Sequence, residues 1–241
     1  MLPKISHPSF EFVVPSTGKK ELFRPFLVKE EKILLMSKTS EDSSEIFRSI
    51  KQVINNCAIS ENFDIDKLTI FDLEYIFLQI RAVSINSITK VSYRDNEDGE
   101  IYSFDVDLTK LEVKFPINID KVIKITDKVG IKMKYPSASI FDDKEFFSYS
   151  GEDSFYELML RCIDKIYNED DLFDPKDYSK QELEEFMDQL DVKIFEKIQN
   201  FMNNIPRLYH TLEYVNKNGN PRIITMNSLN DFFTLGWAII T

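Results

Sequence analysis

Residues that many enzymes rely on are scarce in this chain of 241 residues. It has two histidines, His7 and His210, so a nucleophilic side chain would find few imidazole bases beside it. Six glycines are too few to favour a phosphate-binding loop, and neither a Walker motif nor a dinucleotide fingerprint occurs. The run 151–155 lacks the second glycine of a nucleophile elbow. The sequence therefore predicts no catalytic residues and no cofactor.

Cysteine and long apolar runs are also rare. Cys57 and Cys162 lie far apart on candidate core positions, and we interpret them as buried free thiols, with a disulfide or a reactive thiol as the alternatives. No apolar run approaches the roughly 20 residues of a membrane-spanning helix, and no apolar signal region opens the chain. These features predict a soluble protein made in a reducing cytoplasm.

Basic residues are outnumbered. The 41 acidic and 30 basic side chains give a formal net charge of −11, which repels phosphate backbones and anionic membrane surfaces. We therefore expect neither nucleic acid nor membrane as a partner. The acidic runs 95–100, 142–143 and 169–171 could attract a divalent cation, but 95–100 lacks the spacing of a calcium-binding loop. We interpret all of them as solvated surface charge and predict no metal site.

Apolar residues are abundant, at 43% with 20 phenylalanines, which suffices for a substantial core. The patterns predict an α+β fold with an N-terminal hairpin over residues 9–26 and helices over 28–38, after Asp42 and over 70–84. Thr69 with Asp72 forms a predicted capping box, as does Asp42 with Glu45. The helix over 70–84 is apolar nearly all round, so we expect it at the centre of the N-terminal core.

The middle and the end of the chain alternate between strands and helices. Strands are expected over 87–94, 100–107, 110–114, 121–125 and 129–135. Helices are expected from Gly151 through a stripe that includes Cys162, Ile163 and Ile166, after a Ser179–Glu182 capping box, and up to Pro206. A second hairpin over 208–226 and a short helix capped by Ser228 and Asp231 follow. We expect three segments, 1–86, 87–150 and 151–241, as one compact unit or two closely packed domains.

Two stretches are candidates for binding a partner. The C-terminal segment concentrates aromatic side chains, among them Phe232, Phe233 and Trp237, which either dock on the protein's own core or anchor an interface. The other stretch is the corner between the N-terminal hairpin and the first helix, where Pro25 restricts the backbone. Its charged residues either support the fold or contact a partner; they are Arg24, Lys29, Glu30, Glu31 and Lys32.

Several runs of residues together resemble one family. The runs are 2–5, 10–17, Arg24-Pro25-Phe26-Leu27-Val28-Lys29-Glu30-Glu31-Lys32, 55–57 and 72–84, and the likeness fades after about residue 135. They are similar to the baseplate hub and hub-assembly proteins of T4-like contractile-tailed bacteriophages. Some of those relatives carry paired cysteines near the central hairpin. This chain has none there, which again argues against zinc.

The resemblance implies a non-enzymatic protein of phage tail morphogenesis. The expected role is that of a structural subunit of the central baseplate hub, with other hub or tail proteins as partners and the tape-measure protein as a further candidate. One alternative is a transient assembly chaperone that acts in the host cytoplasm and is absent from the virion. A second is a small soluble enzyme without a recognisable motif.

Overall fold

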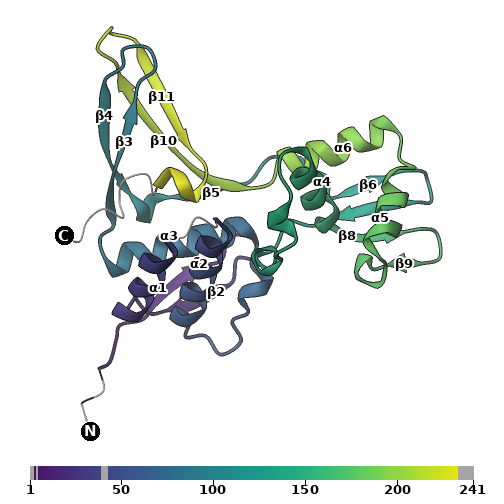
Figure 1. The fold of residues 1–241 in the computed structure, drawn as a ribbon, viewed down its shortest axis with the longest axis horizontal. Helices are drawn as coiled ribbons and strands as arrows, with labels where there is room; N and C mark the ends of the chain where they lie inside the picture. The colour runs from purple at the N-terminus through teal and green to yellow at the C-terminus, as the bar shows by residue number, and fades with distance from the viewer. Residues whose placement is uncertain (1–2, 4, 39–42, 233–241) are drawn as a thin grey trace. The chain divides into compact units, whose positions relative to one another are not determined.

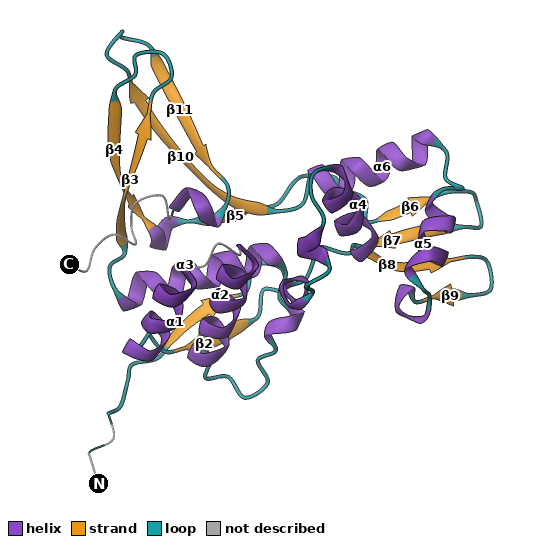
Figure 2. Ribbon diagram, in the orientation of Figure 1, coloured by secondary structure: helices purple, strands orange, loops and turns teal. Residues whose placement is uncertain are grey.

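The computed structural model describes residues 3, 5–38 and 43–232, and its elements mix helices with antiparallel strands (Figures 1 and 2). The predicted α+β class is confirmed. The chain divides into two compact units. The first unit comprises residues 1–114 and 207–241, and the second comprises residues 115–206.

The first unit combines helices with hairpins. Its helices are α1 (Val28–Lys38), α2 (Ser43–Cys57) and α3 (Ile70–Ser84), with 3₁₀ helices η1 (Ile65–Lys67), η2 (Leu108–Lys110) and η6 (Leu229–Phe232). Its strands are β1 (Phe10–Val13), β2 (Lys20–Phe23), β3 (Ile88–Arg94), β4 (Ile101–Asp107), β5 (Glu112–Lys114), β10 (Arg207–Val215) and β11 (Pro221–Met226). The predicted helices over 28–38 and 70–84 and both terminal hairpins are confirmed. Asp42 lies outside the described residues, so its capping pair stays a prediction.

Helix α3 is the central helix of the first unit, and its start is fixed by Asp72. Thr69 and Asp72 form the predicted capping box, in which the Thr69 amide donates to Oδ2 of Asp72 at 2.9 Å. The other oxygen of this fully buried carboxylate accepts from the Ser16 amide at 2.8 Å. One side chain thus satisfies the helix N-terminus and also holds the β1–β2 turn against it. The apolar side chains of α3 fill the core around it; Leu73, Ile76, Phe77, Leu78 and Ile80 are fully buried.

The hairpins β3–β4 and β10–β11 are joined at their turns by polar side chains. Tyr214 donates from its hydroxyl to Oδ2 of Asp95 at 2.6 Å, and Arg222 pairs with Glu97 at 3.2 Å. The Lys217 amide donates to Oδ2 of Asp98 at 2.9 Å. Asp95 is fully buried, whereas the side chains of Glu97 and Glu100 are 34% and 52% exposed, so the interpretation as solvated charge was wrong for part of the 95–100 run. Its carboxylates instead bind the second hairpin, because turn amides and tyrosine hydroxyls supply the donors that water would otherwise provide.

The second unit is inserted between two paired strands of the first. Strand β5 pairs with β10 in antiparallel register, with Lys114 opposite Arg207, and β10 also pairs with β11. The chain therefore leaves the first unit and returns to it at neighbouring backbone positions. This pairing joins residues that are distant in the sequence. The two compact units therefore have other boundaries than the three expected segments 1–86, 87–150 and 151–241.

Replacing residues 115–206 by an Asn-Gly turn is expected to leave a folded first unit. Residues directly opposite each other in an antiparallel pair lie about 4.5–5.5 Å apart, which a two-residue turn spans. The measurement is thiol alkylation of Cys57, which is fully buried in the first unit. Protection equal to that in the full chain is the expected result, and rapid labelling of the shortened chain in native buffer would contradict it.

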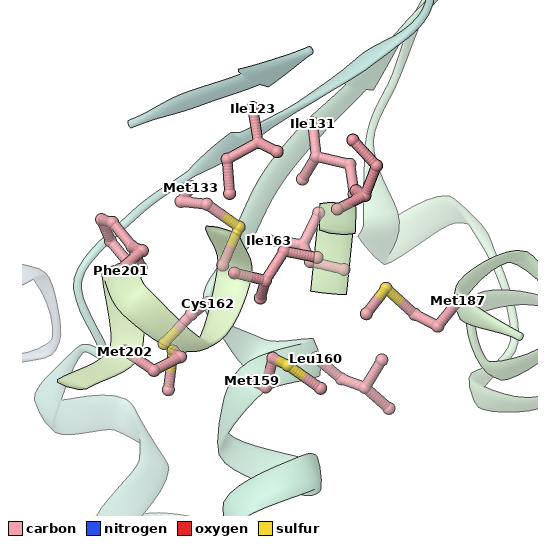
Figure 3. Close-up of a cluster of buried hydrophobic side chains, with 12 residues drawn as sticks. Ile123, Ile131, Met133, Met159, Leu160, Cys162, Ile163, Met187, Phe201 and Met202 are labelled. Atoms are coloured by element: carbon pink, nitrogen blue, oxygen red, sulfur yellow. The ribbon is translucent and has the colours of Figure 1, made fainter. Parts of the chain in front are cut away.

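The second unit packs helices on a small antiparallel sheet. Its strands are β6 (Val122–Lys124), β7 (Gly130–Met133), β8 (Ile163–Tyr167) and β9 (Leu172–Phe173), in the order β6-β7-β8-β9. Its helices are α4 (Glu152–Arg161), α5 (Lys180–Met187) and α6 (Val192–Asn203), with 3₁₀ helices η3 (Ala138–Asp142), η4 (Phe146–Ser148) and η5 (Pro175–Asp177). Figure 3 shows its core, in which Met159 and Leu160 of α4 and Phe201 of α6 gather with side chains of β7 and β8.

The predicted helical stripe through Ile166 was wrong in its second half. Helix α4 ends at Arg161, and Cys162 lies at its C-cap. Ile163 and Ile166 belong to β8, which pairs with β7. Their spacing of three residues suits one face of a helix, whereas a regular strand would place them on opposite faces. In the structure, a register shift between Lys132 and Met133 sets Ile163 opposite Met133 and Ile166 opposite Ile131, and their β-branched side chains suit the strand. The Ser179–Glu182 capping box at the start of α5 is confirmed.

Candidate docking site

The corner between β2 and α1 is held by a buried ion pair. The guanidinium of Arg24 donates to both carboxylate oxygens of Glu30, at 2.9 and 3.1 Å, and the Leu27 amide donates to Oε2 of Glu30 at 3.0 Å. The Glu30 side chain is fully buried, and that of Arg24 is 15% exposed. Pro25 favours an extended Arg24 and a fixed turn, which brings the two side chains together across the start of α1.

The same arginine ties the corner to the end of α2. Its Nη1 donates to the Pro25 carbonyl at 3.0 Å and its Nη2 to the Asn56 carbonyl at 2.7 Å. Its own amide donates to the Cys57 carbonyl at 2.9 Å. Carbonyls in the last turn of a helix lack partners within the helix, so Arg24 satisfies groups that would otherwise be left without a donor.

Ionisation in this corner follows from burial and pairing. Burial alone would raise the pKa of Glu30, but the hydrogen bonds from Arg24 and the Leu27 amide outweigh it, and the pKa lies below its ordinary value. Burial raises the pKa of the Cys57 thiol to about 12, against the opposing charge of Arg24. At neutral pH the pair is therefore charged and the thiol is protonated and unreactive.

Beside this corner, α1 and the C-terminal end of α3 border an apolar groove of about 870 Å³. Its floor includes Phe77 and Leu34, which are buried, and Phe26 lies with its ring 5.6 Å from that of Phe77. Its open edges are apolar side chains that remain exposed to solvent; they are Ile5 at 77%, Val28 at 69%, Leu35 at 48% and Ile85 at 67%. We call this feature the α1–α3 groove.

The corner residues predicted as partner contacts fall into two groups. Lys29, Glu31 and Lys32 line the α1–α3 groove. Arg24 and Glu30 instead face each other inside the fold, where their hydrogen bonds hold the corner. Three residues of the charged stretch thus line the groove, and the other two stabilise the corner beside it.

The C-terminal candidates lie elsewhere in the first unit. Phe232 is 1% exposed and ends η6, whose first residue, Leu229, donates from its amide to Glu74 at 3.3 Å. Oδ2 of Asp231 accepts from the Ser228 amide at 2.9 Å, as the predicted cap requires. Phe233 and Trp237 lie outside the described residues.

Sequence reasoning missed the apolar part of the site. In the sequence, Val28, Ile33, Leu34 and Leu35 can form one apolar face of α1, and a helix face of this kind is normally covered by the fold. Here Val28 and Leu35 remain exposed, and the next residue, Met36, is 75% exposed. The signal available in the sequence was that apolar side chains occur around most of α1. The sequence did not indicate that Arg81 and Ile85, at the end of α3, line the same groove as α1.

Chemistry of other kinds finds little support in the described part of the chain. Within residues 3, 5–38 and 43–232, no group of three or more His, Cys, Asp or Glu side chains could hold a metal ion. Over the same residues, no helix combines the length and apolarity needed to cross a membrane. Both cysteines are free and buried.

The fold and the groove define an α+β protein with an exposed apolar groove beside a corner held by a buried ion pair. Comparison with protein families identifies it further. The family model for the T4 bacteriophage base plate protein matches residues 7–234, so the chain belongs to that family. The match extends well beyond residue 135, where the resemblance in the sequence fades. No curated protein and no solved structure matches the chain.

Proposed function

We propose that the protein is a structural, non-enzymatic subunit of the central hub of a T4-like phage baseplate, and that the α1–α3 groove is a contact with other baseplate or tail proteins. Membership of the base plate family supports a place in the phage tail. The observation that carries the proposal is the exposure of Val28, Leu35 and Ile85 around one groove. Contiguous exposed apolar patches mark interaction sites, and permanent interfaces are the more apolar ones.

Quantitative mass spectrometry of purified particles, beside lysate of infected cells, tests the role. A fixed, small copy number in each particle is the expected result for a hub subunit. Abundance in the lysate with none in the particle would contradict this role and favour the transient assembly chaperone. Detection in neither fraction with tail proteins would contradict both.

Val28→Asp is expected to lower incorporation into particles about tenfold or more, since burying a valine is worth about 1.5–3 kcal/mol and a carboxylate at the interface would add a desolvation penalty. Val28 opens α1, where a negative charge suits the helix dipole, so the fold is expected to survive. Copy number per particle is the measurement.

Val192→Asp is the matched control. Val192 also opens its helix, α6, and is 73% exposed, against 69% for Val28, but lies in the second unit. Normal incorporation is expected for this variant. Normal incorporation of Val28→Asp as well would show that the groove is not a contact required in the particle.

A further inference from the structure

One side chain of the α1–α3 groove has no carboxylate partner among the residues that the structure describes. Arg81 lies in the last turn of α3 and lines the groove, yet it is only 8% exposed. Its guanidinium donates one long hydrogen bond, from Nη2 to Oγ1 of Thr89 at 3.5 Å. Within the described residues, no carboxylate lies within ion-pair distance of it.

A buried cation of this kind is costly. A guanidinium stays charged in proteins, so removing it from water without a carboxylate beside it is unfavourable. Burial lowers the pKa of Arg81, which is the direction expected for a desolvated cation. Arg24, also in this region, shows the contrast, because it makes a bidentate pair with Glu30.

The charge of the groove differs in sign from that of the chain. Lys29 and Lys32 lie on its rim with Arg81 beside the apolar floor, against the single acidic lining residue Glu31. Glu30 pairs with Arg24 and lies 3.5 Å from Nζ of Lys29, so one buried carboxylate faces these two cations. The groove is therefore a basic site on a protein whose formal net charge is −11. An acidic occupant complements it.

The apolar surface also extends beyond what a small ligand would cover. Ile5, Val28 and Ile85 are each more than half exposed on the edges of the groove, and Met36 is 75% exposed further along α1. A protein segment that lies along α1 would cover these side chains together. Amphipathic segments bind apolar grooves in this way, with anchors at regular spacing.

We infer that the α1–α3 groove binds an amphipathic segment of another baseplate protein, and that an Asp or Glu among its apolar residues pairs with Arg81. The inference rests on the proposed function only for the source of the partner. Lys29 and Lys32 attract the acidic segment, the apolar floor receives its anchors, and Arg81 selects the carboxylate. Arg81 is then the specificity-determining residue of the groove.

Peptides that tile the other baseplate proteins of the same phage test this, titrated with the full chain by fluorescence anisotropy. The expected result is selective binding of a peptide that carries Asp or Glu within an apolar pattern. Replacing that residue by Asn or Gln should weaken binding about tenfold or more, as a buried charge-assisted bond predicts. Arg81→Met should weaken binding by a similar factor, and the two changes together by little more than either alone.

Arg94→Met is the matched control, since Arg94 is an exposed arginine at the end of β3 and is absent from the groove lining. It should leave binding unchanged. Protection of Cys57 from alkylation checks the fold of each variant. If Arg81→Met failed to fold, the acid-to-amide peptides would still decide the question with the unaltered protein.

Three outcomes would overturn the inference: no selective binding by any peptide, binding that ignores the acid-to-amide change, or competition by a peptide of residues 233–241 that shows the chain's own end to be the occupant. Particle mass spectrometry answers a separate question. Absence from the virion with a positive peptide result would refute the hub subunit but keep the groove specificity, and the reverse result would refute only the groove specificity.

Discussion

Replacing Arg24 by Met is expected to lower the free energy of unfolding by about 3 kcal/mol, the lower end of the usual cost of breaking a buried ion pair, because Nζ of Lys29 stays 3.5 Å from Oε1 of Glu30. Glu30 would keep its carboxylate at a fully buried position and lose both hydrogen bonds from the guanidinium. The carbonyls of Pro25 and Asn56 would lose their donor as well. Chemical denaturation measures the change, and alkylation of Cys57 reports on this unit specifically.

The thiol readout separates opening of the corner from a direct electrostatic effect. Removing the positive charge of Arg24 raises the pKa of Cys57 further and so makes the closed thiol less reactive. Faster labelling of Cys57 in Arg24→Met would therefore report opening of the structure. Lys20→Met is the control, because Lys20 pairs with Glu11 at 2.7 Å on the exposed surface, where ion pairs contribute little.

The double variant Arg24→Met with Glu30→Leu should recover most of the lost stability, since it removes the uncompensated charge.

The pH dependence of stability gives a second check on the Arg24–Glu30 pair. The pKa of Glu30 is lower in the folded protein than its ordinary value, so its contribution is present above about pH 4.3, the unfolded value. It is lost as pH falls through the lower folded pKa. The difference in unfolding free energy between the unaltered protein and Arg24→Met should shrink in that pH range. An unchanged denaturation midpoint of Arg24→Met at neutral pH would contradict a stabilising role for the Arg24–Glu30 pair.

Phe201→Ala is expected to destabilise the second unit by about 3–5 kcal/mol through loss of buried surface and the cavity left behind. Phe201 is 1% exposed in the core drawn in Figure 3, and its ring stacks on Tyr135 at 5.6 Å. Cys162 is fully buried in the same core, as Cys57 is in the first unit. Site-resolved alkylation in increasing denaturant therefore measures the unfolding of each unit in one experiment.

The expected result is earlier labelling of Cys162 with the Cys57 transition unchanged. Tyr178→Ala is the control within the second unit, since Tyr178 is 40% exposed and should cost far less. Equal shifts of the labelling transitions of Cys57 and Cys162 would show that the two units unfold together, and would contradict independent unfolding of the second unit.

The sequence predicted the individual elements well wherever caps and periodicity agreed. The Thr69–Asp72 and Ser179–Glu182 boxes mark the starts of α3 and α5, because their side chains bond the first free amides of the helix. The two turn motifs Asp98-Gly99 and Asn218-Gly219 mark hairpins that are present, since both glycines adopt a positive φ. These are local interactions, and residues a few positions apart suffice to specify them.

The candidate site could be predicted only in part, from Arg24–Lys32. That stretch indicated a functional corner, but not which of its charges face inward. The pairing of Arg24 with Glu30 depends on the end of α2 arriving beside Pro25, and the groove depends on α3 ending opposite α1. Contacts between segments so far apart in the chain leave no periodic pattern in the sequence. The strand at Ile163–Tyr167 escaped prediction for a similar reason, because it forms by pairing with β7.

By itself, the sequence determined an acidic, aromatic-rich α+β protein with capped helices and tight hairpins, and its likeness to phage baseplate proteins. Tertiary structure alone decided that residues 115–206 form an inserted unit, because Lys114 pairs with Arg207 across the insertion. It also decided that Glu30 is buried and paired, that Arg81 is buried with no carboxylate partner in the described part of the chain, and that Val28 is left in solvent. Burial and charge pairing are set by which distant segments meet, and that information lies in the packing of the whole unit.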